Sequence, residues 1–335
     1  MSKVRWHTVM TLMAQALLLV LVQVTVTLAA ERPAMPDLTA PRFAVFLPLL
    51  NGCQGPAAPS PDGDDRLAQI ETWVYQLTGY KDHRLDEIAA SNFDLAVVDL
   101  AWDGSSRFFT AADVGGVQAT GKLILAYFEI GAIEDYRPEW PDVPDDLKLG
   151  PVSGWPGEQY VKYWDPRWWP IVQGRVDQAL SAGFDGAYLD MTVTYGEIPA
   201  DAAGTDRADL ARKMVALIAR VSEYAKRHDP SFKIVPQNSP ELHHYTGYLD
   251  AIDGLGMEEL YFLATDKACT YSWCVSNRNA TAAIAAAGKP VFTIDYANQQ
   301  VNIDSAYRQS LADGFVPYVS VRSLNLLRIN EGWEP

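Results

Sequence analysis

The segment GFDGAYLD, residues 183–190, joins a glycine, a short apolar run and a terminal aspartate. A glycine also precedes an apolar run at three other places, namely Gly121 before KLILAYF, Gly288 before KPVFTID and Gly314 before FVPYVSV. Because glycine readily adopts the left-handed conformation that ends a helix, each of these residues indicates a short connection from a helix to a strand.

Eight short runs rich in β-branched or aromatic residues predict strands at Thr72–Leu77, Leu95–Asp99, Leu123–Phe128, Gly186–Asp190, Lys233–Pro236, Gly254–Glu258, Pro290–Asp295 and Phe315–Val321. Helical patterns fill the intervals. The clearest spans residues 206–228, with Thr205 as the expected N-cap. One face of that helix carries Leu210, Met214, Leu217, Ile218 and Val221. We therefore predict an α/β fold, a single (β/α)8 TIM barrel. No Gly-rich phosphate loop follows the first strand, which argues against a nucleotide-binding fold.

The N-terminus is typical of an export signal. Lys3 and Arg5 precede an uncharged, mostly apolar run from Thr8 to Ala30. That run is also long enough to span a bilayer, which takes ~20 residues. We predict a signal peptide or membrane anchor over residues 1–30, a Pro/Gly-rich linker over 31–66 and the barrel domain over 67–335. The protein is then secreted or extracytoplasmic, and membrane-anchored if the leader is retained.

An oxidising compartment favours a disulfide between Cys269 and Cys274, which lie close together in CTYSWC. Cys53 is expected to be an unpaired thiol in the linker. No HExxH or other spaced cluster of metal ligands and no GxSxG motif occurs, so we expect neither a metal nor another cofactor. The histidines, including the adjacent His243 and His244, are interpreted as surface or capping residues.

The formal net charge of −15 argues against a nucleic-acid or anionic-lipid partner, since both require clustered Lys and Arg. Ten Trp and sixteen Tyr are many for 335 residues. Most are expected in the core, and some at the mouth of a sugar-binding cleft, where a flat ring covers the C–H face of a pyranose. We expect a monomer that binds a polysaccharide or oligosaccharide.

Polar residues end the predicted strands, namely Gln76, Asp99, Glu129, Asp190, Asn238, Glu258, Asp295 and Arg322. In a barrel of this class the reacting groups lie at these ends. Gathering acids in one cleft is unfavourable, which suggests a function, although Asp99 and Glu129 could equally cap helices or pair with Arg322. Glycoside hydrolysis needs two carboxyl groups across one bond, and Asp190 with Glu258 or Glu259 could supply them. Neighbouring strand residues point to opposite sides, so only one of these two glutamates is expected to face the cleft.

The chain resembles glycoside hydrolase family 114, the endo-α-1,4-polygalactosaminidase-like barrel hydrolases. The resemblance rests on WVYQLTGY (73–80), LAVVDL, ILAYFEIGAIEDYR (124–137), YVKYWDPRWWPIV (160–172), GFDGAYLD (183–190), IVPQNSPEL (234–242), GLGMEELYF (254–262), FTIDYAN (292–298) and GFVPYVSVRSLNLL (314–327). These segments occur in order over nearly the whole predicted domain.

The resemblance implies that Asp190 and Glu258 are the catalytic pair of a glycosidase. Analogy with related α-glycosidase barrels makes Asp190 the nucleophile and Glu258 the acid/base. The resemblance further implies a substrate pocket lined by Tyr75, Asp99, Tyr127, Asn238, Asp295, Tyr296 and Arg322, although outer-layer packing is an alternative for the tyrosines. Trp155, Tyr163 and Trp164 lie in the long loop after the third strand, a natural place for residues that stack on sugars; packing under a lid is the alternative. The family often carries acids where this chain has Val193 and Ala132, so the resemblance leaves the identity of the sugar open.

Two functions are compatible with the sequence. The first is an exported glycosidase that degrades a polysaccharide, with an amino-sugar polymer such as α-1,4-polygalactosamine as the expected substrate. The second is a non-catalytic carbohydrate-binding or cell-envelope module built on the same barrel. They differ in whether Asp190 and a glutamate from 258–259 converge at an open cleft.

Overall fold

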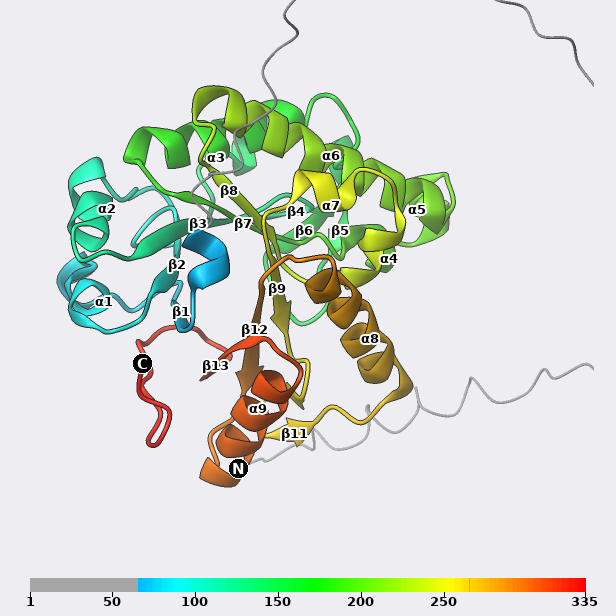
Figure 1. The fold of residues 1–335 in the computed structure, drawn as a ribbon. Helices are drawn as coiled ribbons and strands as arrows, with labels where there is room; N and C mark the ends of the chain where they lie inside the picture. Colours follow the sequence, from blue (N-terminus) through cyan, green and yellow to red (C-terminus); the bar gives the residue numbers. More distant parts are fainter. Residues whose placement is uncertain (1–65, 265) are drawn as a thin grey trace, which may run out of the picture. The chain divides into compact units, whose positions relative to one another are not determined.

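The computed structural model describes residues 66–264 and 266–335, and eight parallel strands run through the centre of this part of the chain (Figure 1). They are β1 (Trp73–Tyr75), β2 (Leu95–Asp99), β3 (Leu123–Glu129), β7 (Gly186–Asp190), β8 (Lys233–Pro236), β9 (Leu255–Glu258), β12 (Val291–Tyr296) and β13 (Val316–Ser320). All eight predicted strands are confirmed. The predicted leader, Cys53 and the predicted linker up to residue 65 lie outside the described residues.

The central strands form two parallel sheets, ordered β1-β2-β3-β7-β8 and β9-β12-β13. A single parallel bridge between Gln237 and Gly256 connects the end of β8 to β9, and the Asn238 amide donates to the Gly256 carbonyl at 2.8 Å. Between β1 and β13, the Trp73 indole donates to the Val316 carbonyl at 3.0 Å. The protein thus has an α/β fold with a parallel central sheet.

A cluster of aromatic rings fills the space between these strands. Trp73 on β1 lies 6.2 Å from the ring of Tyr188 on β7, 5.7 Å from Phe292 on β12 and 6.0 Å from Tyr318 on β13. A Cβ atom on Gly256 would lie 2.0 Å from the Tyr188 hydroxyl, so only glycine leaves room for that ring. Strands distant in sequence therefore bury their side chains in one common aromatic core.

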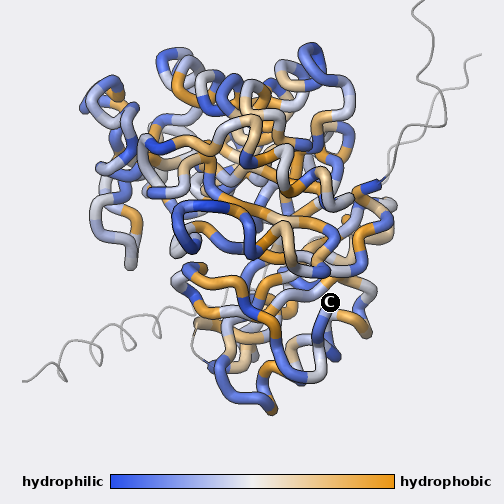
Figure 2. The backbone as a smooth tube through the Cα atoms, turned by 90° about the vertical axis from the view of Figure 1, so that its left-hand side faces the viewer, coloured by the Kyte–Doolittle hydropathy of each residue, from blue (hydrophilic) through white to orange (hydrophobic). Residues whose placement is uncertain are grey.

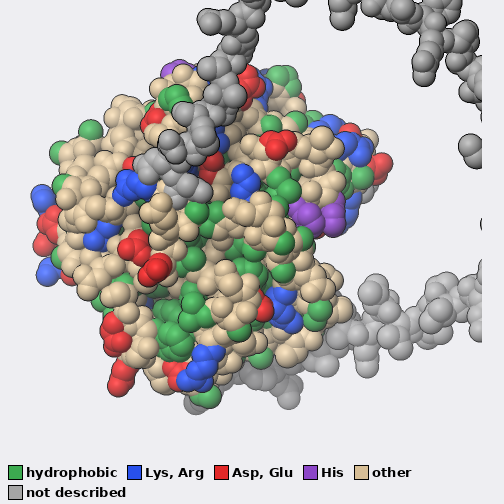
Figure 3. All heavy atoms as spheres, in the orientation of Figure 1, with side chains coloured by type: hydrophobic (Ala, Val, Ile, Leu, Met, Phe, Trp, Pro, Cys, Tyr) green, Lys and Arg blue, Asp and Glu red, His purple; other side chains and the backbone are tan. Residues whose placement is uncertain are grey.

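Helices cover the outside of the strands. They are α1 (Asp86–Ala90), α2 (Ala111–Gln118), α3 (Trp169–Ala182), α4 (Thr194–Glu197), α5 (Ala200–Ala203), α6 (Arg207–His228), α7 (Tyr248–Ala251), α8 (Ser272–Ala286) and α9 (Gln300–Ala312). Figure 2 shows hydrophobic residues along the central strands and hydrophilic residues mainly on the outer turns. On the face in Figure 3, Lys and Arg side chains are scattered among Asp and Glu. Within the described residues, no helix combines the length and apolar character needed to cross a membrane.

The predicted helix at 206–228 is confirmed as α6, and its predicted apolar face is buried. The predicted N-cap was wrong by one residue. Asp206 is the cap, because its carboxylate accepts the Asp209 amide at 2.7 Å, while the Thr205 hydroxyl bonds the Asp209 side chain. The left-handed conformation predicted for the four glycines between helices and strands is also confirmed. Gly183 ends α3 with φ 79°, and Gly121, Gly288 and Gly314 all have positive φ.

Two insertions modify the strand–helix alternation. After β3, the strands β4 (Ala132–Glu134), β5 (Lys148–Pro151) and β6 (Glu158–Val161) form a small antiparallel sheet ordered β4-β6-β5. After β9, β10 (Phe262–Leu263) pairs with β11 (Lys267–Ala268), and the predicted disulfide between Cys269 and Cys274 follows. Short 3-10 helices occupy Arg66–Gln69, Lys81–His83, Trp140–Asp142, Asp145–Leu147 and Pro240–His244. Both insertions contribute residues near the carboxyl ends of the central strands.

Candidate active site

Asp190 and Glu258 lie close together at the carboxyl ends of β7 and β9. Between them, Gln237 follows the last residue of β8 and donates from one amide nitrogen to Asp190 Oδ1 at 3.1 Å and to Glu258 Oε2 at 2.5 Å. Since both oxygens bond the same nitrogen, they are no farther apart than the sum of these distances, 5.6 Å. The Tyr75 hydroxyl donates to the Gln237 Oε1 at 2.9 Å, which orients the amide so that its nitrogen faces the two carboxyl groups.

Asp190 is held by two further donors. The Tyr127 hydroxyl donates to Oδ2 at 2.8 Å and the Met191 amide to Oδ1 at 2.6 Å. Burial raises the pKa of Asp190 from 3.8 to about 6, against the lowering effect of these hydrogen bonds. The charges of Glu134 and Glu197 raise it further. Asp190 is therefore partly protonated in mildly acidic solution.

Glu258 is surrounded by a different set of groups. The Tyr296 hydroxyl donates to Oε1, and the Asn238 amide donates to Oε2 at 3.1 Å while its own oxygen accepts the Glu258 backbone N–H at 3.0 Å. Asn238 adopts φ 63°, a left-handed conformation that asparagine tolerates better than most residues. Burial, followed by the charge of Asp190, raises the pKa of Glu258 from 4.5 to about 7. An ionised Asp190 thus favours the protonated form of Glu258.

Both carboxyl groups open onto a cleft of about 430 Å³. Of the residues predicted at the site, the cleft is lined by Tyr75, Asp99, Tyr127, Asp190, Asn238, Glu258, Tyr296 and Arg322. Trp155, from the loop before β6, also lines it; its side chain is 48% exposed, and the Arg322 guanidinium lies 5.0 Å from its ring. Within the described part of the chain, no group of three or more His, Cys, Asp or Glu side chains could hold a metal ion.

Asp295 and Trp164, both predicted to line the pocket, do not line the cleft. Asp295 precedes Tyr296 on β12, so strand alternation points it to the opposite side. There its carboxylate accepts the Tyr261 and Phe262 amides at 2.8 and 2.7 Å. Trp164 packs against the core, edge-on to Tyr163 and beneath the Lys213 ammonium of α6.

The model of glycoside hydrolase family GH114 matches residues 55–334. This chain belongs to family GH114. An uncharacterized protein of Deinococcus radiodurans is 34% identical over 310 residues, covering 84% of this chain and 97% of that protein. An uncharacterized protein of Methanocaldococcus jannaschii is 30% identical over 277 residues, covering 78% of each chain.

Two solved structures resemble the fold of this GH114 chain. The first is Ega3 of Aspergillus fumigatus, in complex with galactosamine, with a TM-score of 0.62, 16% identity and coverage of 81% of this chain and 98% of that chain. The second is the glycoside hydrolase domain of PelA from Pseudomonas aeruginosa, with a TM-score of 0.62, 18% identity and coverage of 77% and 97%. The parallel α/β fold is therefore similar to that of barrel glycoside hydrolases.

The prediction that only one of Glu258 and Glu259 faces the cleft was wrong, since both line it. Strand alternation does not extend past the end of β9 at Glu258. Glu259 adopts φ 55°, which turns the chain, and its carboxylate also accepts the Ala264 amide at 2.6 Å. Asp99 also differs from expectation: it pairs with Arg137, not Arg322, through two buried bonds of 3.0 and 2.9 Å.

Several acidic residues of the GH114 cleft come from β3 and the inserted sheet. Glu129 was expected either at the site or as a capping or paired residue, whereas Glu134 and Glu158 were not predicted. Glu129 and Glu158 are almost fully buried, and each has one carboxylate oxygen without a hydrogen-bond partner among the described residues. Burial and the charge of Glu134 raise the pKa of Glu129 well above its ordinary value. Burial, followed by the charges of Asp190 and Glu134, raises the pKa of Glu158 to about 8. Glu158 had no signal in the sequence beyond its place in GEQY.

Proposed function

We propose that this GH114 chain is an exported endo-glycosidase that cleaves α-1,4 linkages in a galactosamine-containing polysaccharide. Asp190 is the nucleophile and Glu258 the acid/base. The observation that carries the proposal is the pair of carboxyl groups that share the Gln237 amide at the bottom of an open cleft. A separation of no more than 5.6 Å between their nearest oxygens supports a retaining mechanism, for which about 5–5.5 Å is typical, against about 6.5–9.5 Å for inversion.

The electrostatics of the pair support the assignment of roles. Burial raises the pKa of both carboxyl groups, and the charge of Asp190 raises the pKa of Glu258 further, so an ionised Asp190 favours the protonated form of Glu258. Glu258 then donates its proton to the glycosidic oxygen as the bond to the anomeric carbon breaks, and Asp190 attacks that carbon to form a glycosyl ester. In the second step the Glu258 carboxylate removes a proton from water. That water attacks the anomeric carbon and releases Asp190.

An amino-sugar substrate is favoured by the charge of the cleft. Its lining contains eight carboxyl-bearing side chains, Asp99, Glu129, Glu134, Glu158, Asp190, Glu197, Glu258 and Glu259, and two arginines, Arg137 and Arg322. Raised pKa values favour the neutral forms of Glu129, Glu158 and Glu258, and Asp99 and Glu134 pair with Arg137. Asp190, Glu197 and Glu259 still outnumber the other cation of the lining, Arg322, and would attract a protonated amine on a sugar. The resemblance to Ega3, whose structure holds galactosamine, points in the same direction.

The proposal includes a closed (β/α)8 barrel and export. The bridge from Gln237 to Gly256 and the Trp73–Val316 hydrogen bond favour closure at the two gaps between the sheets. Export is supported by the basic and then apolar start of the sequence and by the Cys269–Cys274 disulfide, which forms and persists in oxidising compartments. The leader serves as a cleaved signal or as a membrane anchor.

The test is hydrolysis by the purified domain of three polymers: α-1,4-linked galactosamine, its N-acetylated form and a neutral galactan. We expect cleavage of the first and loss of that cleavage in Asp190→Asn and Glu258→Gln. The matched control is Asp250→Asn, at an exposed position on α7, which is expected to keep full activity. Binding of the polymer without cleavage by the unaltered chain would instead identify a carbohydrate-binding module.

A further inference from the structure

A second cavity continues the cleft on the far side of Glu258. This outer hollow, also about 430 Å³, is lined by Val193, Tyr195, Gly196, Glu197, Arg207, Asn238, Ser239, Pro240, Glu241, Glu258, Glu259, Trp273 and Asn277. It shares Val193, Glu197, Asn238, Glu258 and Glu259 with the cleft. Asp190 lines the cleft but not the outer hollow. The two cavities thus meet at Glu258, with the second carboxyl group on one side only.

Trp273 and Tyr195 are the aromatic residues that line the outer hollow, and Trp273 is the exposed one. It lies in the first turn of α8, its side chain is 47% exposed, and its ring stacks on that of Tyr271 at 6.0 Å with an angle of 8° between the planes. A tryptophan that served only as core packing would be largely buried. Polar groups of Glu241 and Asn277 line the same hollow. An apolar ring face beside polar side chains suits a pyranose, which has an apolar C–H face and hydroxyls at its edge.

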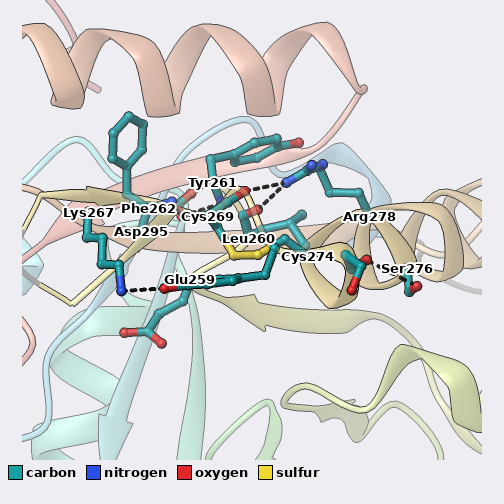
Figure 4. The surroundings of a disulfide bond; sticks show 12 residues. Glu259, Leu260, Tyr261, Phe262, Lys267, Cys269, Cys274, Ser276, Arg278 and Asp295 are labelled. Atoms are coloured by element: carbon teal, nitrogen blue, oxygen red, sulfur yellow. Dashed lines mark hydrogen bonds between the residues drawn. A yellow bond between two sulfur atoms is a disulfide. The ribbon is translucent and has the colours of Figure 1, made fainter. Parts of the chain in front are cut away.

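The disulfide fixes this tryptophan relative to Glu258. Cys269 and Cys274 close a short loop that contains Tyr271 and Trp273, and Cys274 is fully buried next to Trp273. The Cys269 amide donates to the Tyr261 carbonyl at 2.7 Å. Figure 4 shows Arg278 reaching from α8 to the Leu260 and Cys269 carbonyls, at 3.0 and 3.4 Å. The loop is therefore tied to the segment that directly follows Glu258 and Glu259.

We propose that the outer hollow binds the sugar units on the leaving-group side of the cleaved bond, with Trp273 as their stacking surface. An acid that protonates the leaving oxygen faces the leaving group, whereas the nucleophile lies on the other side of the anomeric carbon. Glu258 lines both cavities and Asp190 only the cleft, so the chain of sugars passes Glu258 into the outer hollow. The inference rests on the proposed roles of Asp190 and Glu258.

The test compares a hexasaccharide of α-1,4-linked galactosamine with the α-fluoride of the trisaccharide, whose leaving group is a single fluoride ion and cannot occupy the outer hollow. Trp273→Ala is expected to raise KM for the hexasaccharide about tenfold, which corresponds to the loss of one ring contact, and to leave the kinetics of the fluoride unchanged. Trp273→Phe is expected to restore most of the loss. The matched control is Val275→Ala, two residues along the same helix and 48% exposed, which is expected to change neither substrate. An unchanged hexasaccharide KM in Trp273→Ala, or equal losses on both substrates, would overturn the inference.

A binding measurement separates this inference from the proposed function. If the unaltered chain cleaves neither substrate, calorimetry on Asp190→Asn with and without Trp273→Ala still measures the contribution of Trp273 to hexasaccharide affinity. A tenfold weaker affinity in the double variant supports the outer hollow as a sugar site even where hydrolysis fails. No difference in affinity, or no binding at all, contradicts it. The paired variant Cys269→Ser/Cys274→Ser is expected to raise the hexasaccharide KM as Trp273→Ala does, and an unchanged KM would show that the disulfide does not position this ring.

Discussion

The substitution Glu158→Gln tests the electrostatic account of the cleft through the stability of the protein. Glu158 is 6% exposed, and burial together with the charges of Asp190, Glu134 and Glu197 raises its pKa from 4.5 to about 8; Arg137 opposes this rise. Between pH 4.5 and about pH 8, Glu158 keeps its proton in the folded state but has released it in the unfolded state. The free energy of unfolding therefore falls as pH rises through this window, by about 1.4 kcal/mol per pH unit.

Over the whole window the loss approaches ~4–5 kcal/mol, an upper limit because neighbouring acids share the titration. Glutamine resembles the protonated acid and cannot ionise, so Glu158→Gln removes this loss. In a domain of this size each kcal/mol corresponds to about 2 °C in Tm. We expect equal Tm values for the variant and the unaltered chain below pH ~4.5, and a variant Tm higher by roughly 5–10 °C above pH ~8.

The assay is a series of thermal unfolding curves across this pH range, followed by circular dichroism. Glu223→Gln on α6 is the matched control, because its side chain is exposed and its contact with Arg227 is a surface pair. That control is expected to follow the unaltered chain at every pH. Parallel curves for Glu158→Gln and the unaltered chain would refute the argument that burial of this carboxyl destabilises the folded state at alkaline pH.

Three further predictions concern the site. First, kcat/KM is expected to rise with pH near about 6, as Asp190 ionises, and to fall near about 7, as Glu258 loses its proton; a profile already falling below pH ~5 would contradict these assignments. Second, the Tyr296 hydrogen bond lowers the pKa of Glu258, so Tyr296→Phe is expected to move the alkaline limb upward, and a downward shift in the pH–rate profile would count against that contact. Third, Arg137→Met leaves Asp99 buried without its partner and is expected to destabilise the fold by about 3–5 kcal/mol in chemical denaturation. The double variant Asp99→Asn/Arg137→Met is expected to recover much of that loss. Equal stability of Arg137→Met and the unaltered chain would oppose this view.

The strands and Asp190 could be predicted from the sequence because both follow from simple periodic rules. A glycine, an apolar run and a final polar residue specify a helix end, a strand and a strand terminus, and Asp190 fits that pattern. The pattern left Glu258 and Glu259 open, and the family resemblance favoured Glu258. The same rule failed at Asp295. It lies one residue before the end of β12 and, facing away from Tyr296, is bonded by the amides of the segment after β9.

Other parts of the site depend on contacts that no local pattern encodes. Gln237 and Asn238 both reach Glu258, because Gln237 forms a bridge to Gly256 beside β9 and Asn238 then takes a positive φ. Glu158 enters the cleft from an antiparallel sheet inserted after β3, whose position is decided by tertiary packing. Trp155, on that inserted segment, lines the cleft, whereas Trp164 nearby packs toward α6. Spacing along the sequence does not distinguish these two tryptophans.

The central claim is that Asp190 attacks the sugar while Glu258 supplies the proton, and trapping the intermediate tests it most directly. A 5-fluoro galactosaminyl fluoride slows release of the sugar from the enzyme, so a retaining enzyme is expected to accumulate the glycosyl ester. Mass spectrometry of the digested protein is predicted to find one added sugar on the peptide containing Asp190, and none in Asp190→Asn. Turnover of the reagent with no adduct, or an adduct on Glu258 or Glu259, would contradict the account.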